Sequence, residues 1–242
     1  MRGALVAFAL MIALGLAPVA HAQSTSAESP RSGAVRLKLG SYNPRNSIDG
    51  DPSLTSEPYR DTFGIRGMLL FEVAYEHYLW QDVGAVGLGL SAGYAEKYGS
   101  AIVAADPTEP TSERTALQVF PLRLQVVYNF DYPALNWSIP LVPYVRGGIA
   151  FVPWRITKGG AIERFGDARG AGAKWGVSGA AGLAFLLDVL EPRFAADFDA
   201  DVGVNHTYLF GEYDVLRTDL LLGGGGLNLS SHQWMFGLNL EF

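Results

Sequence analysis

One stretch of the chain holds the residue types that nucleophilic catalysis needs. His206 is followed by Asp219, Ser230 and Ser231, and a serine, a histidine and an aspartate are the usual set for acyl transfer. No catalytic motif surrounds these residues, and polar side chains in a predicted loop are commonly just solvated. We therefore predict that the protein is not an enzyme and that it has no catalytic residue.

A second stretch is similar to the opening of a calcium-binding loop. Asp197, Asp199 and Asp201 alternate along the chain as the first ligands of such a loop do. Val202 stands where the loop requires glycine, and Tyr208 stands where it requires a bidentate glutamate. We therefore predict neither a metal site nor a cofactor, and we assign the three aspartates to the polar face of a strand.

The composition excludes several classes of protein. The chain has 242 residues, of which 49% are hydrophobic and 17% are charged, so it is too apolar for a disordered protein. It has no cysteine, which excludes disulfide scaffolds, zinc–thiolate clusters and thiol nucleophiles. The net charge is −6, and the basic residues form no cluster, so nucleic acid is not an expected partner.

The first residues have the features of a secretory signal peptide. Arg2 precedes an apolar run, and Ala20-His21-Ala22 is a small-residue cleavage site. The alternative, a membrane-spanning helix, is disfavoured because the run is short and is closed by Pro18. We predict a signal peptide over residues 1–22 that is cleaved near Ala22, and a flexible N-terminal segment over residues 23–33.

Beyond the signal, apolar residues recur with a period of two, which is typical of strands with two different faces. The clearest case is the end of the chain, where Trp234, Phe236, Leu238, Leu240 and Phe242 alternate with Met235, Gly237, Asn239 and Glu241. Seven further segments behave in the same way, near residues 35–40, 71–76, 86–95, 122–129, 145–151, 174–185 and 194–204. The phase slips at Phe120 and Pro121, which predicts a bulge there.

The connections between these segments alternate between long and short. The long ones are near 43–67, 98–114, 155–173 and 206–233, and the others are near 81–83, 131–140 and 188–192. This layout predicts an all-β fold, an eight-stranded antiparallel transmembrane up-and-down β-barrel over residues 34–242 with both chain ends in the periplasm. A ten-stranded barrel is the alternative, because Leu216, Thr218, Leu220 and Leu222 also alternate.

The residues on the two faces favour a membrane barrel over a soluble, ligand-binding barrel. The polar face of two strands is almost wholly Gly, Ala and Ser, which suits a narrow lumen better than a surface in water. Aromatic residues form two predicted interfacial girdles. These are Tyr78, Trp80, Phe130, Tyr132, Phe194 and Phe242 at the periplasmic level, and Tyr42, Tyr94, Tyr98, Trp154, Trp175 and Trp234 at the outer level.

Charged residues fall on the face assigned to the lumen. The basic ones are Arg36, Lys38, Arg123, Arg146 and Lys174, and the acidic ones are Glu72, Glu76, Asp197, Asp199, Asp201 and Glu241. We expect them to fill the narrow lumen as ion pairs, with Lys174 and Asp201 as one pair, because a buried charge needs a partner. The alternative is a narrow pore whose charged constriction selects small solutes.

The terminal strand, with Phe242 as its last residue, resembles the signal that the barrel assembly machinery reads in bacterial outer-membrane proteins. The mature chain as a whole resembles small outer-membrane barrels of the OmpA-domain and OmpW kind, without the peptidoglycan-binding domain of full-length OmpA-like proteins. Pro143–Gly148, His206–Phe210 and Glu212-Tyr213 are also similar to a proteobacterial family of outer-membrane barrels of unknown function. The resemblance implies the outer membrane of a Gram-negative cell, and as partners its lipids, lipopolysaccharide and the assembly machinery.

We therefore expect a monomeric barrel with a mainly structural or passive role. One alternative is a narrow pore, or an OmpW-like channel for small or hydrophobic solutes. Another is a surface-binding or adhesion module, because the predicted outer loops carry the aromatic residues Trp154, Phe165, Tyr208 and Phe210.

Overall fold

The computed structural model describes residues 30–44, 48–49, 66–103, 106–159, 161–162, 164–165, 168–218 and 226–242. The predicted signal peptide and residues 23–29 lie outside this part of the chain. No helix in the described part is long and apolar enough to cross a membrane.

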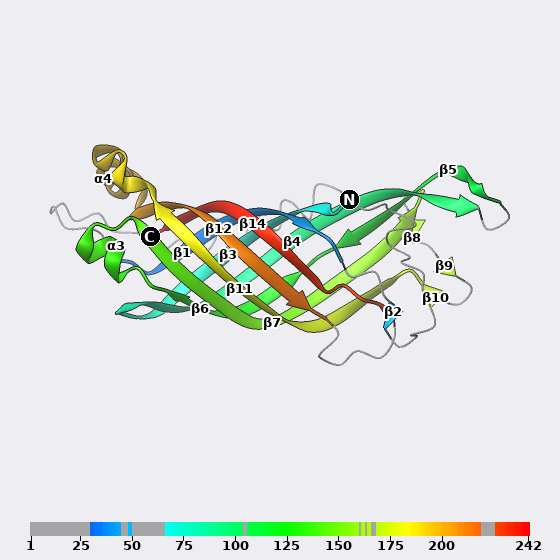
Figure 1. Cartoon of the computed structure of the whole chain (residues 1–242), viewed down its shortest axis with the longest axis horizontal. Helices are drawn as coiled ribbons and strands as arrows, with labels where there is room; N and C mark the ends of the chain where they lie inside the picture. The colour runs from blue at the N-terminus through cyan, green and yellow to red at the C-terminus, as the bar shows by residue number, and fades with distance from the viewer. Residues whose placement is uncertain are drawn as a thin grey trace.

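Antiparallel strands close into a ring in the order β1, β3, β4, β5 with β6, β7, β11, β12 and β14, and β14 pairs back onto β1 (Figure 1). Their bounds are Gly33–Tyr42, Met68–Asp82, Gly84–Val103, Asp106–Val119 with Leu122–Asn129, Leu141–Lys158, Ala171–Leu186, His206–Arg217 and Ser231–Glu241. A closed ring leaves no strand with an unpaired edge. A β-sheet that spans a membrane needs this closure, because lipid cannot hydrogen-bond to the backbone groups of an open edge. The predicted antiparallel barrel and its eight ring positions are confirmed.

The fourth ring position is interrupted where the sequence predicted a bulge. β5 ends at Val119 and β6 begins at Leu122, and both segments pair with β4 on one side and with β7 on the other. In the gap, the Gly93 N–H donates to the Pro121 carbonyl at 2.8 Å, and the Phe120 N–H donates to the Pro153 carbonyl at 2.9 Å. These bonds keep the wall continuous although the proline cannot donate one.

The outer surface of the ring is apolar. Leu90 and Val126, for example, expose 57% and 55% of their surface, and large hydrophobic residues are exposed on every strand position of the ring. An apolar surface of this extent would be unstable in water, and it matches the hydrocarbon band of a membrane barrel. Most of the predicted girdle residues on strands are exposed, but Tyr42 and Tyr78 were placed wrongly, because both point inward and are buried.

The seventh strand lies later in the chain than the predicted segment near residues 194–204. Residues 192–202 form the helix α4 (Pro192–Val202), and the strand is β12 (His206–Arg217), which had been assigned to a loop. Phe194, Phe198 and Val202 are four residues apart, and this spacing satisfies both a strand period of two and a helix period of 3.6. A proline in the first turn and a left-handed Gly203 at the C-cap favour the helix.

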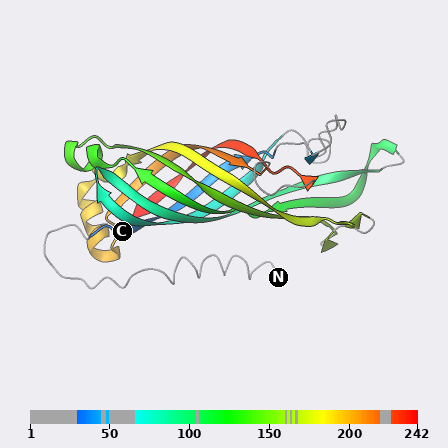
Figure 2. The same cartoon turned by 90° about the horizontal axis from the view of Figure 1, so that it is seen from below.

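The barrel has two unlike ends. The end that contains Phe242 also carries the tight β3–β4 turn, α3 (Tyr132–Trp137), η1 (Leu187–Val189) and α4, and we call it the termini end (Figures 1 and 2). The opposite end, here the loop end, carries the small ladders β2–β13 (Ile48–Asp49, Gly226–Leu227), β7–β8 (Ala161–Ile162) and β9–β10 (Arg164–Phe165, Ala168–Arg169). The longest strand, β4, has 20 residues and extends at this end together with β5.

Candidate functional site

Eight charged side chains meet inside the barrel, and we call them the charged network. They are Arg36 and Lys38 on β1, Glu72 and Glu76 on β3, Arg123 on β6, Arg146 on β7, and Glu212 and Asp214 on β12, and none is more than 5% exposed. The four cations and four anions leave the network neutral as a set. Balance of this kind is required, because a charge removed from water without a partner is strongly unfavourable.

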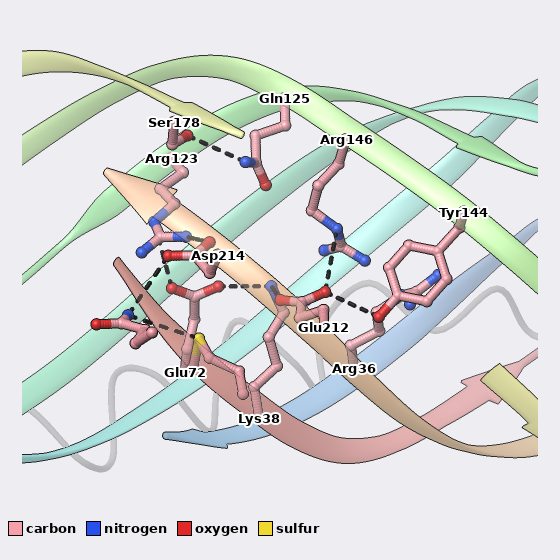
Figure 3. Close-up of polar contacts among 12 residues, drawn as sticks. Arg36, Lys38, Glu72, Arg123, Gln125, Tyr144, Arg146, Ser178, Glu212 and Asp214 are labelled. Atoms are coloured by element: carbon pink, nitrogen blue, oxygen red, sulfur yellow. Dashed lines mark hydrogen bonds and ion pairs between the residues drawn. The ribbon is translucent and has the colours of Figure 1, made fainter. Parts of the chain in front are cut away.

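One half of the network is built around Glu72 (Figure 3). Lys38 Nζ lies 2.8 Å from Glu72 Oε1 and 3.1 Å from Glu212 Oε1. Arg123 Nε lies 3.5 Å from Glu72 Oε2, and Arg123 Nη1 lies 2.5 Å from Asp214 Oδ2. Each of these two cations therefore bridges two carboxylates on different strands.

The other half is built around Glu76. Arg36 Nε lies 2.8 Å and Arg146 Nη2 lies 3.1 Å from Glu76 Oε1. Arg146 also approaches Glu212 Oε2 at 3.5 Å, and the Tyr144 hydroxyl donates to the same oxygen at 2.9 Å. The Arg36 guanidinium lies over the Tyr144 ring, 4.4 Å from its centre. Glu212 thus joins the two halves into one network.

Several of these contacts cross the lumen rather than follow its wall. Arg123 and Asp214 connect β6 to β12, although β7 and β11 lie between those strands in the ring. Arg146 and Glu76 connect β7 to β3 in the same way, because β4 and β6 lie between them. The network therefore fills the cross-section, as expected for a barrel whose interior is just wide enough for side chains.

Apolar layers lie on both sides of the network. At the loop end, a buried cluster includes Met68, Leu117, Met235 and Leu229, and the Tyr42 hydroxyl donates to the Leu229 carbonyl at 2.5 Å. At the termini end, a second buried cluster comprises Ala134, Val142, Tyr144, Ala184, Leu186, Tyr208 and Phe210. The charged network therefore lies between two buried clusters, and its eight side chains are at most 5% exposed.

A second group of polar residues lies at the termini end. Arg31 Nη1 lies 2.5 Å from Asp131 Oδ2 and 3.1 Å from Glu241 Oε1, and the Tyr208 hydroxyl donates to Glu241 Oε2 at 3.0 Å. Burial alone would lower the pKa of Arg31, but the two carboxylates outweigh it and raise the pKa above its ordinary value. A cavity of about 10 Å³ adjoins this group, which is the space of about one water molecule.

The structure places most of the expected lumen charges inside the barrel. Arg36, Lys38, Glu72, Glu76, Arg123, Arg146, Lys174 and Glu241 are all buried on strands. The assignment of Asp197, Asp199 and Asp201 to the lumen was wrong, because all three lie on α4 outside the ring. The expected pair of Lys174 and Asp201 is also wrong, since Lys174 lies opposite Val152 toward the loop end and α4 lies at the termini end.

Glu212 and Asp214 were not among the predicted lumen charges, because the segment that forms β12 was predicted to be a loop. A period-two signal was present, since Tyr208, Phe210, Glu212 and Asp214 are buried while Leu209 and Tyr213 between them are exposed. For the same reason Tyr208 and Phe210 were wrongly counted as aromatic residues of an outer loop. Trp154 lies on β7, partly buried against the loop-end cluster, and the side chain of Phe165 lies outside the described part.

The structure does not bring the candidate catalytic set together. His206 pairs with Glu241 in the sheet, whereas Ser231 pairs with Leu216. His206 and Ser231 are therefore separated by the length of β14 from Ser231 to Glu241, ten residues or about 33 Å. The partner of His206 is instead Asp188, whose Oδ2 lies 2.7 Å from Nδ1. Asp219 lies outside the described residues, within which no cluster of three or more His, Asp or Glu side chains is arranged to hold a metal ion.

Solved structures with a similar fold are small outer-membrane proteins. OprG of Pseudomonas aeruginosa is 12% identical over 90% of this chain and 99% of its own, with a TM-score of 0.49. Ail, the attachment invasion locus protein of Yersinia pestis, solved with the heparin analogue sucrose octasulfate, is 12% identical over 87% and 99%, with a TM-score of 0.44. Neisserial surface protein A is 12% identical over 88% and 95%, with a TM-score of 0.43.

A comparison with curated protein sequences gives no match. The model of the family described as outer membrane protein beta-barrel domain matches residues 7–242, which include all the strands of the ring. The apolar outer surface and the closed ring are the features that this family requires. The chain belongs to the family of outer-membrane β-barrel domains.

Proposed function

We propose that the protein is a closed barrel with a structural or passive role in the outer membrane, without enzymatic activity. The observation that carries this proposal is the charged network, in which Arg123–Asp214 and Arg146–Glu76 span the lumen. A continuous water path would have to separate at least some of these pairs. Separating a buried pair leaves an uncompensated charge, which costs several kcal/mol.

The proposal includes an orientation in the membrane. The short β3–β4 turn, the start of β1 and the end of β14 lie at the termini end. The long strand extensions lie at the loop end. Outer-membrane barrels carry short turns toward the periplasm and long loops toward the outside. The loop end then faces the medium and contacts lipopolysaccharide. The proposal also includes cleavage of the signal peptide, residues 1–22, near Ala22. The assembly machinery then inserts the mature chain into the membrane as a monomer.

Ion conduction tests the closed lumen. The refolded protein is added to a planar bilayer and, separately, to liposomes for a swelling assay, and its folded fraction is measured by heat-modifiable migration. We expect no stable unitary conductance and no swelling with small sugars. A general-diffusion porin in the same membranes is the positive control. Stable unitary events in proportion to the folded fraction would contradict the proposal and support the narrow-pore alternative.

A second candidate function is contact with other surfaces through the loop end. A strand needs about 9 to 11 residues to cross a membrane, whereas β4 has 20, and β5 pairs with its distal half. The β4–β5 hairpin therefore projects well beyond the hydrocarbon. Replacing residues 99–115 by a short turn should reduce cell aggregation and attachment to glass, at an equal level of folded barrel, if the hairpin mediates contact. Unchanged attachment would contradict this role.

A further inference from the structure

The helix α4 lies across the barrel axis at the termini end. It follows η1 directly and leads through Gly203 into β12. Figure 1 shows it nearly end-on, and Figure 2 shows it from the side, lying across the long axis of the barrel. Because the barrel axis crosses the membrane, α4 runs approximately parallel to the membrane plane.

One side of the helix is mainly apolar and the opposite side is charged, and Asp199 lies beside Ala195 at the edge of the apolar side. Ala195, Phe198 and Val202 follow the i, i+3, i+7 spacing of a single helix face. Arg193 and Asp197, four residues apart, lie on the other side and are exposed. The apolar side is incompletely covered by the protein, because Val202 is 62% exposed and Phe198 is only partly buried.

This exposed apolar surface continues the lipid-facing band of the barrel. Leu183 on β11 and Leu209 on β12 face outward, with 47% and 52% of their surface exposed. β11 ends at Leu186 and passes directly into η1 and the following turn, where Val189 and Leu190 are 44% and 69% exposed. Lipid that covers the band therefore also reaches the start of α4.

Two considerations favour lipid over a protein partner as the occupant of this surface. An 11-residue helix is marginal by itself and depends on its apolar face being covered, and the lipid band is the apolar medium that adjoins it. The helix carries three aspartates and one arginine, so attraction to anionic headgroups cannot be what holds it there. Insertion of apolar side chains is sufficient, as in other helices that lie in the membrane interface.

We propose that α4 is an interfacial helix, with Leu190 and Val202 inserted into the lipid monolayer at the termini end and with Arg193 and Asp197 in water. The helix then fixes the depth at which this end of the barrel sits in the membrane. The proposal requires only that the barrel is in a membrane, so it does not depend on whether the lumen is closed.

Site-directed spin labelling tests this depth, and the absence of native cysteine makes single labels straightforward. Val202→Cys and Leu190→Cys report on the inserted side, and Asp197→Cys is the matched control on the same helix. Leu209→Cys is the reference for a lipid-exposed site. The labelled proteins are reconstituted in nanodiscs of zwitterionic phosphatidylcholine, and heat-modifiable migration confirms folding.

We expect labels at positions 202 and 190 to collide more with oxygen than with a water-soluble nickel chelate, as the reference label at 209 does. The label at position 197 should collide more with the nickel chelate than with oxygen. Equal nickel accessibility at 202 and 197 would overturn the proposal. Protection of 202 and 190 from both reagents would also overturn it, because a protein surface would then cover α4. Should Val202→Cys not fold, Leu190→Cys, which lies outside the helix, carries the test.

Discussion

Arg123 Nη1 and Asp214 Oδ2 lie 2.5 Å apart and join two strands, β6 and β12, that are not neighbours in the ring. The Arg123→Ala variant leaves the Asp214 carboxylate buried without its main partner, so we expect it to lower the free energy of unfolding by about 3 to 5 kcal/mol. The double variant Arg123→Ala/Asp214→Ala should lose less than the sum of the two single variants.

Urea unfolding of the refolded barrel in lipid vesicles measures this coupling. Arg193→Ala, on the exposed side of α4, is a control that should change stability by no more than about 0.5 kcal/mol. If the losses of the two single variants simply add, the pair does not contribute as a buried unit.

Gly237 on β14 marks a place where the wall of the barrel has no room for a side chain. A Cβ at this position would overlap the Leu37 carbonyl oxygen and would lie 3.0 Å from the Phe210 ring. We expect Gly237→Ala to destabilise the barrel by about 1 to 3 kcal/mol and to slow its folding into vesicles. Gly179→Ala is the matched control, because its nearest neighbour is the Arg146 carbonyl oxygen at 3.6 Å. Equal folding rates and stabilities of the two variants would contradict the expectation.

The proposed orientation predicts which end of the barrel reagents reach in intact cells. Tyr98 toward the loop end and Val83 in the β3–β4 turn are 53% and 50% exposed, so their labelling should differ only through the membrane barrier. A membrane-impermeant maleimide should label Tyr98→Cys in intact cells and Val83→Cys only after the outer membrane is permeabilised. Labelling in the opposite order would reverse the assignment of the two ends.

We predict two separable roles for Phe242. Its backbone closes the ring, since its carbonyl accepts from the Ser32 and Gly33 N–H groups at 2.7 and 2.9 Å, and its ring stacks on Tyr75 at 6.2 Å. Phe242→Ala keeps the backbone bonds, so we expect near-normal folding in vesicles but a clear loss of assembled protein in cells. Quantifying the heat-modifiable form in outer-membrane fractions tests this. Normal assembly in cells would show that the aromatic side chain is not part of the assembly signal.

Strand periodicity made the architecture predictable. Outward residues such as Trp234, Phe236 and Leu238 are exposed as the alternation required, because every second residue of a strand must face lipid whatever its neighbours are. The phase slip at Phe120 and Pro121 was predictable for the same reason, and it coincides with the boundary between β5 and β6.

The place of the seventh strand was not decided by local pattern. The residues from Pro192 to Val202 satisfy both periods, and the choice of helix depends on the competing segment, β12, which pairs with both β11 and β14 and so closes the ring. Local spacing contains no information about which of two alternating segments completes a closed sheet.

The sequence by itself determined that the protein is a barrel with an apolar outside and a charged inside. Both properties follow from the alternation of apolar and polar residues along each strand, because successive side chains point to opposite faces. Only the tertiary structure decided which charges meet. Arg123 and Asp214 are 91 residues apart in the chain, and their contact exists because the closure of the ring brings β6 and β12 to opposite sides of a lumen that two side chains can span.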